Sequence, residues 1–109
     1  MTRVTLTESR GGWCRLRAVG EFDRDTCDQF RAATRVALAG RCREIVVDLA
    51  EVTFVDAATV GALLACREAA ATHGCDLCVV NESGVAARVL EIAGARSKLA
   101  AANQPSARR

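Results

Sequence analysis

The chain has 109 residues, of which 50% are hydrophobic and 26% charged, a length and composition typical of one globular domain and unlike those of a disordered chain. Its formal net charge is only +2 and its arginines are scattered, which excludes the basic stripe that nucleic-acid binding requires. The N-terminus lacks the apolar stretch of a secretory signal, and residues 57–66, the longest strongly apolar run, fall far short of the roughly 20 residues of a membrane span. We therefore expect a cytoplasmic protein without direct membrane insertion.

Residues 2–8 and 13–19 each alternate polar and apolar side chains, a pattern typical of half-exposed strands. The segment between them, 9–12, ends in two glycines, so the two strands are expected to form a β-hairpin. Asp25 is then positioned to cap a helix whose apolar side chains recur at helical spacing until Gly40.

Residues 44–49 are too uniformly apolar for a half-exposed strand and predict a central strand covered on both faces. After a short bridge through residues 53–54, Asp56 lies where the N-cap of a second helix belongs. That helix is expected to run to His73, which lies beside Gly74 and suits the C-terminal end of a helix dipole.

Residues 76–81 repeat the buried-strand pattern, and Ser83 is positioned to cap a third helix that ends at Gly94. This helix is expected to pack through one apolar face formed by Val85, Val89 and Ile92. A last short strand is expected over residues 97–100, which closes a single domain over residues 1–100. A polar, flexible tail is expected over residues 101–109.

The order of elements is therefore β-β-α-β-α-β-α(-β). Strands that alternate with helices predict an α/β fold with a mixed, partly parallel sheet and right-handed crossovers. The catalytic chemistry is sparse: His73 is the single histidine and has no serine or cysteine partner near it in sequence, and no glycine-rich phosphate loop opens a helix. We expect neither an enzyme nor a bound cofactor.

The six cysteines are expected to be reduced thiols that pack as small hydrophobic side chains. Cys75 and Cys78 have the spacing of half a zinc site, but the single histidine cannot complete one, so no metal is expected. On one regular strand these two residues would lie about 10 Å apart on opposite faces, too far for a disulfide. Redox sensing through Cys66, Cys75 or Cys78 is an alternative.

Several segments, taken with this order of elements, resemble the anti-sigma factor antagonists, the bacterial family that defines the STAS domain. The resemblance runs from Val4 to about Leu99 and depends on the order and spacing of its parts. These parts are Val19 to Asp23, Val46 to Leu49, Val52 to Asp56, Gly61 with Leu63 and Leu64, and residues 79–94. The resemblance implies a STAS-like mixed β-sheet and a role in regulating transcription through protein–protein interaction.

In this family an Asp-Ser-Ser-Gly or Asp-Ser-Thr-Gly segment begins the second helix. An anti-sigma factor, a histidine-kinase-like serine kinase, phosphorylates the hydroxyl before the glycine. The unphosphorylated antagonist binds this kinase and frees a sigma factor, whereas phosphorylation breaks the complex. Here Ala57 and Ala58 replace the hydroxyl residues and Thr59 replaces the glycine. Alanine accepts no phosphate, so the resemblance implies an antagonist without the usual switch at Ala58, and Thr59 is the alternative acceptor.

The resemblance also implies a partner-binding surface around this turn. It comprises Asp23, Asp56, Ala57, Ala58, Thr59 and Val60. Asp56 would act mainly as the helix cap and Asp23 as an interface residue. Two other functions are a STAS-like interaction or scaffold subunit of a transporter or lipid-trafficking complex, and a redox-responsive regulator that uses its cysteines. The sequence leaves open whether the exposed first strand forms a homodimer.

Overall fold

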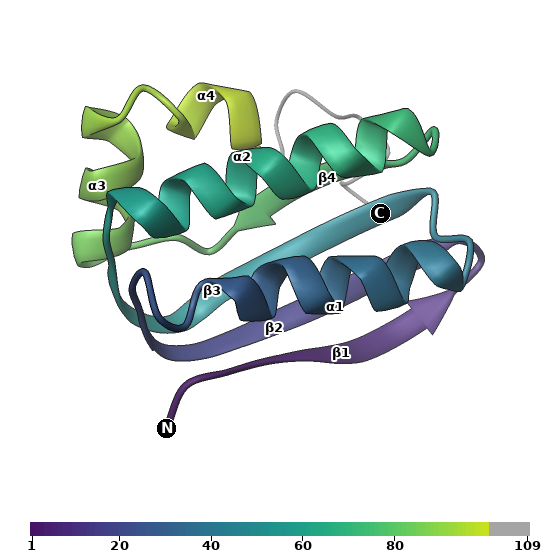
Figure 1. Cartoon of the computed structure of the whole chain (residues 1–109), viewed down its shortest axis with the longest axis horizontal. Helices are drawn as coiled ribbons and strands as arrows, with labels where there is room; N and C mark the ends of the chain where they lie inside the picture. The colour runs from purple at the N-terminus through teal and green to yellow at the C-terminus, as the bar shows by residue number, and fades with distance from the viewer. Residues whose placement is uncertain (101–109) are drawn as a thin grey trace.

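The computed structural model describes residues 1–100, and the tail predicted over residues 101–109 lies outside the described residues. Within residues 1–100, four strands form one sheet and helices lie across one of its faces (Figure 1). None of these helices is long and apolar enough to cross a bilayer.

An antiparallel hairpin opens the fold, as the alternating pattern predicted (Figure 1). It consists of β1 (Arg3–Arg10) and β2 (Trp13–Phe22), which both run further than expected. Gly11 and Gly12 alone make the turn, with φ angles of 59° and 82° that favour glycine. β1 forms an exposed edge of the sheet, and a homodimer through this edge stays a prediction.

Two further strands, β3 (Glu44–Val55) and β4 (Asp76–Val80), give the sheet order β1-β2-β3-β4. β2 pairs with β3 and β3 with β4 in parallel, so the mixed sheet is confirmed. β3 is longer than predicted because β2 continues to Phe22, which pairs with Val55. The bridge predicted at residues 53–54 is therefore wrong, since these residues belong to the strand.

The middle of β3 is buried on both faces, as its apolar run predicted. Ile45 and Val47 belong to the main hydrophobic core. Val46 alternates to the other face, where it lies beside Cys78 of β4, and both side chains are buried.

Two long helices, α1 (Asp28–Ala39) and α2 (Ala57–Thr72), lie side by side across one face of the sheet (Figure 1). One hydrophobic core fills the space between the helices and the sheet. Its largest fully buried side chains include Phe22, Phe30, Leu16, Ile45, Leu49, Leu63 and Leu77. Burying each of them contributes roughly 1.5–3 kcal/mol, and this packing fixes the position of α2 on the sheet.

The start of α1 differs from the prediction. Asp25 does not cap the helix, because its amide donates to the Asp23 carboxylate at 2.9 Å. The helix begins at Asp28 after Cys27, which makes no side-chain cap bond. The carboxylate that organises this entry is therefore that of Asp23.

The third helix, α3 (Gly84–Ile92), packs only in part through the predicted face, since of its three residues Val89 alone lies against the core. Ala86 and Leu90 are buried, whereas Val85 and Ile92 are 48% and 79% exposed. The inner face of α3 is therefore formed by Ala86, Val89 and Leu90. Ser83 stands at the N-cap as expected, but its side chain makes no cap bond.

The strand predicted over residues 97–100 is wrong. A short helix, α4 (Arg96–Leu99), occupies this segment after Gly94, whose φ of 71° ends α3 as expected. Leu99 is fully buried, and only Ala100 forms a parallel bridge to the sheet. The buried leucine is accommodated by the helical turn, so strand pairing is reduced to a single residue.

Candidate functional site

The first turn of α2 is organised by Asp56, which the sequence correctly identified as the N-cap. Asp56 has extended backbone angles, φ −115° and ψ −177°. Its Oδ1 accepts hydrogen bonds from the Thr59 amide and the Thr59 hydroxyl, both at 2.9 Å. The backbone carbonyl of Asp56 accepts from the amide of Val60 at 3.1 Å. Asp56 thus stabilises the first turn of α2 through both its side chain and its backbone carbonyl.

These contacts also set the charge state of Asp56. Partial burial raises the pKa of its carboxyl group, but hydrogen bonds from the Thr59 amide and hydroxyl outweigh this effect and lower the pKa below its usual value. Asp56 is therefore ionised at neutral pH. Its charge lies at the N-terminus of α2, where the helix dipole favours an anion.

The residues that follow Asp56 differ sharply in exposure. Ala57 is exposed and Ala58 half-buried, whereas Thr59 is 0% and Val60 3% exposed. The methyl groups of Ala57 and Ala58 therefore form the outer surface of the turn. The one hydroxyl of the turn points inward and is already bonded to Asp56.

The loop that contains Asp23 lies next to this turn. Phe22 pairs with Val55 at the ends of the parallel strands β2 and β3, so the loops that follow begin side by side. The backbone amide of Arg24 interacts with the Asp56 carboxylate and contributes to its low pKa. The expected proximity of Asp23 and Asp56 is thus present.

Asp23 itself has a clear local role. Its Oδ1 accepts from the amides of Asp25 and Thr26 at 2.9 and 3.2 Å and from the Thr26 hydroxyl at 3.1 Å. Its backbone carbonyl accepts from the amide of Cys27 at 2.8 Å. The side chain remains exposed, so it can contact a partner while it holds the loop.

Phe54 is a surface residue that sequence reasoning missed. It lies in β3 two residues before Asp56 and is 41% exposed. Aromatic side chains, phenylalanine included, are enriched at protein–protein interfaces relative to the rest of the surface. Side chains alternate between the two faces of a strand, so a buried Val55 requires Phe54 to point to the opposite face. This alternation is the sequence signal that could have identified Phe54.

Acidic side chains surround the turn. Four exposed carboxylates lie at the end of β2, on the loop and at the start of α1: Glu21, Asp23, Asp25 and Asp28. Arg24 is the basic residue within this loop. A complementary partner surface would therefore be basic.

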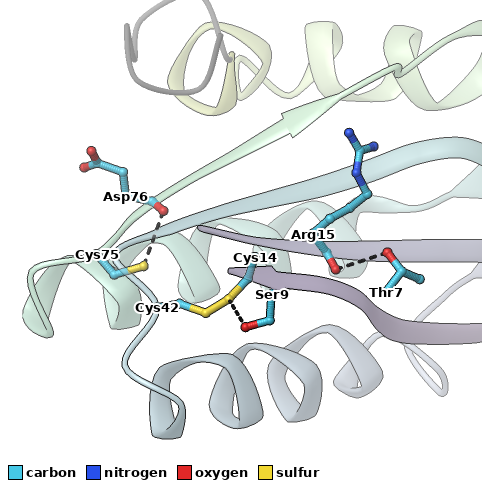
Figure 2. The surroundings of a disulfide bond; sticks show 7 residues. All are labelled: Thr7, Ser9, Cys14, Arg15, Cys42, Cys75 and Asp76. Carbon is cyan, nitrogen blue, oxygen red and sulfur yellow. Dashed lines mark hydrogen bonds between the residues drawn. A yellow bond between two sulfur atoms is a disulfide. The ribbon is translucent and has the colours of Figure 1, made fainter. Parts of the chain in front are cut away.

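A disulfide joins Cys14 and Cys42 at the other end of the sheet (Figure 2). The prediction of six reduced thiols is therefore wrong for this pair. Cys14 lies at the start of β2 and Cys42 in the loop before β3, 28 residues apart in sequence with their Cα atoms 6.2 Å apart. Both are buried, and the Ser9 hydroxyl lies 3.7 Å from the Cys14 sulfur.

The cysteines singled out for redox chemistry are free and buried. Burial raises the pKa of Cys66, and it is the main cause that raises those of Cys75 and Cys78 to about 11, with smaller contributions from nearby carboxylates. These thiols are therefore protonated at neutral pH, which makes them slow nucleophiles. The Cys75 thiol instead donates to the carbonyl of Asp76 at 3.4 Å (Figure 2).

No group of three or more metal-ligating side chains occurs within residues 1–100. The one hydroxyl in the first turn of α2, that of Thr59, is buried and donates to the Asp56 carboxylate. What this turn offers is a surface with neighbouring acidic side chains, the exposed methyl group of Ala57 and the half-buried one of Ala58, which suits recognition by another protein.

Residues 6–100 match a family model described as "Mlab, STAS domain". The comparison with curated proteins returned no match. Solved structures with the same fold include an anti-sigma factor antagonist from Mycobacterium paratuberculosis, which is 22% identical, with a TM-score of 0.74 over 91% of this chain and 81% of that one.

Two structures of SpoIIAA are also similar. The unphosphorylated form of this anti-sigma factor antagonist is 21% identical, with a TM-score of 0.65 over 82% of each chain. The phosphorylated form, a Bacillus cell fate determinant, is 24% identical, with a TM-score of 0.63 over 89% of this chain and 87% of that one. At these identities the likeness shows a common fold.

Proposed function

Because the chain belongs to the STAS domain family, we propose that it is an anti-sigma factor antagonist that lacks the usual phosphorylation switch. It binds an anti-sigma factor, a histidine-kinase-like serine kinase of the bacterial cytoplasm, and thereby frees a sigma factor. The chain acts by binding and not as an enzyme. The partner contacts the surface around the first turn of α2.

One observation carries this proposal: the turn from Asp56 to Val60 has an ordered helix cap but presents no hydroxyl to solvent. Asp56 caps the helix and Asp23 orders the adjacent loop. Between them Ala57 and Ala58 form the outer surface. A kinase that docks here finds a methyl group at Ala58, where the antagonists of this family carry the acceptor.

The burial of Thr59 supports the loss of the switch. A kinase acceptor must reach the γ-phosphate of ATP in line with the leaving group. The Thr59 side chain is fully buried and its hydroxyl donates to Asp56. Phosphorylation would require the cap to open, and the added charge would then lie against the Asp56 carboxylate.

The partner surface consists of two parts. Exposed carboxylates of the loop favour a basic patch on the anti-sigma factor. Phe54 and the methyl groups of Ala57 and Ala58 supply the apolar contact. Thr59 and Val60 are buried, so they support this surface from below.

Binding to the anti-sigma factors of the native host tests the proposal. The wild-type complex should survive incubation with ATP. Ala58→Ser should form the same complex and lose it when ATP is added, because the variant restores a hydroxyl at the acceptor position. Ala57→Ser is the matched control, since it adds the same hydroxyl one residue earlier and should leave the complex intact.

Two results would contradict the proposal. Failure of the wild type to bind any anti-sigma factor of the host would contradict the proposed function as an antagonist. Phosphate recovered on Thr59 of the wild type would instead show that the protein has a phosphorylation switch at that residue.

A second candidate is a STAS-like interaction subunit of a transporter or lipid-trafficking complex. The observation that favours it is the matched family model, whose description names Mlab and not the phosphorylated antagonists. Co-purification from the native host separates the two functions, since a co-purified kinase supports the first and co-purified membrane transport subunits support the second.

A redox-responsive regulator is the third candidate function, and the Cys14–Cys42 disulfide favours it.

A further inference from the structure

A groove of about 700 Å³ lies between α1 and α2, away from the turn described above. Its floor is formed by Leu38 of α1 and by Ala65, Cys66 and Ala69 of α2. The alanines leave space because their side chains end at the β-carbon, so the two helices cannot fill the gap between them. The result is a mostly apolar channel that opens to solvent.

The rim of this groove is basic. It carries Arg31, Arg35 and His73, and no acidic residue is part of its lining. Arg31 pairs with Asp28 at 2.6 Å but keeps 41% of its side chain exposed. Arg35 is exposed and forms no ion pair within residues 1–100.

Two further observations place this charge next to the apolar floor. The positive charges of Arg31 and Arg35 both act on the thiol of Cys66, although burial dominates its pKa. His73 also lines the groove, and its Nδ1 lies 3.0 Å from the carbonyl of Ala69 and 3.2 Å from the Thr72 hydroxyl.

We propose that the groove binds a single-chain amphiphile with an anionic head group, either a carboxylate or a phosphate. The alkyl chain lies along Leu38, Ala65 and Ala69, and the head group pairs with Arg35. Apolar burial supplies the affinity and the arginine supplies the orientation. An apolar floor with an unpaired cation at its rim is complementary to such a ligand and repels cationic amphiphiles.

This inference does not depend on the proposed function. Ala65 lies nine residues beyond Asp56 along α2, or about 13 Å at 1.5 Å per residue. Ligand binding in the groove can therefore be measured with or without an anti-sigma factor.

The test is calorimetric titration of the full chain with dodecanoate, dodecyl phosphate and dodecanol, each below its critical micelle concentration. We expect saturable binding with one anion per chain, and dodecanol at least tenfold weaker because it cannot pair with Arg35. The two anions distinguish the carboxylate from the phosphate as the preferred head group. Decanoate should bind about an order of magnitude more weakly than dodecanoate, since each buried methylene changes affinity about fourfold.

Variants locate the site. Arg35→Glu should weaken dodecanoate binding about tenfold, whereas Arg88→Glu, the same reversal at an exposed residue of α3, should leave it unchanged. Ala69→Leu should weaken it by filling the groove, whereas Ala32→Leu, at an exposed position of α1 outside the groove, should not. Amide shifts of Ala65, Cys66 and Ala69 in NMR spectra should follow the titration.

The proposal fails if no saturable binding occurs, or if Arg35→Glu and Ala69→Leu both bind dodecanoate as the wild type does. It also fails if the groove amides shift on addition of a protein partner and not of dodecanoate, because the groove would then belong to a protein interface.

Discussion

The two ends of the sheet are held together by contacts of different range. At the turn end, formed by the loop 23–27 and the first turn of α2, the Asp23 and Asp56 side chains accept most of their hydrogen bonds from residues two or three positions further along the chain. The Arg24 amide is the exception, since it reaches the Asp56 carboxylate from the neighbouring loop. At the disulfide end, Cys14 is bonded to a residue 28 positions away. Beside it, Trp13 and Glu44 each keep a buried polar atom that has no hydrogen-bond partner among residues 1–100.

This difference separates recognition from stability. A turn that is organised by its own residues can change its surface without unfolding the domain. The disulfide end joins distant segments by a covalent bond, which persists in the unfolded chain and restricts its conformations. We therefore expect changes at the turn end to act mainly on partner binding, and changes at the disulfide end to act mainly on the free energy of unfolding.

Reduction of Cys14–Cys42 should have the largest effect. The bond closes a loop of 28 residues, for which the chain-entropy model gives a stabilisation of about 3–4 kcal/mol. Urea unfolding with and without a thiol reductant measures this difference. The double variant Cys14→Ala with Cys42→Ala is the control, since its unfolding should not respond to the reductant.

The same experiment can contradict the division between a turn end that acts on recognition and a disulfide end that acts on stability. Reduced protein that is as stable as oxidised protein, yet binds its partner differently, would show that the disulfide end controls recognition. Equal partner affinity per folded molecule in both redox states is the expected result.

Phe54→Ala should have the next largest effect, and on binding. Phe54 is 41% exposed beside Asp56, so its removal should weaken partner binding about tenfold, which corresponds to about 1.4 kcal/mol. Titration calorimetry against the anti-sigma factor measures this loss. Val36→Ala, at a residue of α1 that is 60% exposed, should leave the affinity unchanged; an equal loss there would mean that the interface is not confined to the turn end.

The sequence predicted what local chemistry determines. The Asp56 cap, the glycine turn and the buried strands follow from patterns within a few residues. The Cys14–Cys42 pair could not be predicted, because no local pattern relates residues so far apart. The end of β3 was missed for a similar reason, since its last residues are strand only because β2 lies beside them.

The remaining differences arise where two local patterns compete. On α3 the spacing of Val85, Val89 and Ile92 suggested the inner face, but the fold buries Ala86 and Leu90 and leaves only Val89 of the predicted face against the core. At the candidate site, the sequence placed Thr59 in the first turn and could not tell whether its hydroxyl points outward. α2 is apolar on most of its circumference, so its periodicity gave no orientation.

Asp56→Asn should have the smallest effect and tests the turn end alone. Asparagine also caps helices well, so stability at neutral pH should change by only a few tenths of a kcal/mol. Because the pKa of Asp56 is lower in the folded chain than its ordinary value, its charge stabilises the fold above about pH 4. This contribution is lost as the pH falls through the folded pKa.

The variant lacks this titration, so the difference in unfolding free energy between wild type and Asp56→Asn should shrink from pH 5 to pH 2. Asp48, whose pKa is also lowered because hydrogen bonds and the charge of Arg15 outweigh its burial, titrates in both proteins and cancels in the comparison. Asp25→Asn is the matched control, since its carboxylate accepts no hydrogen bond within residues 1–100. A pH-independent difference for Asp56→Asn would mean that the cap works without its charge, and the turn end would then be held by geometry alone.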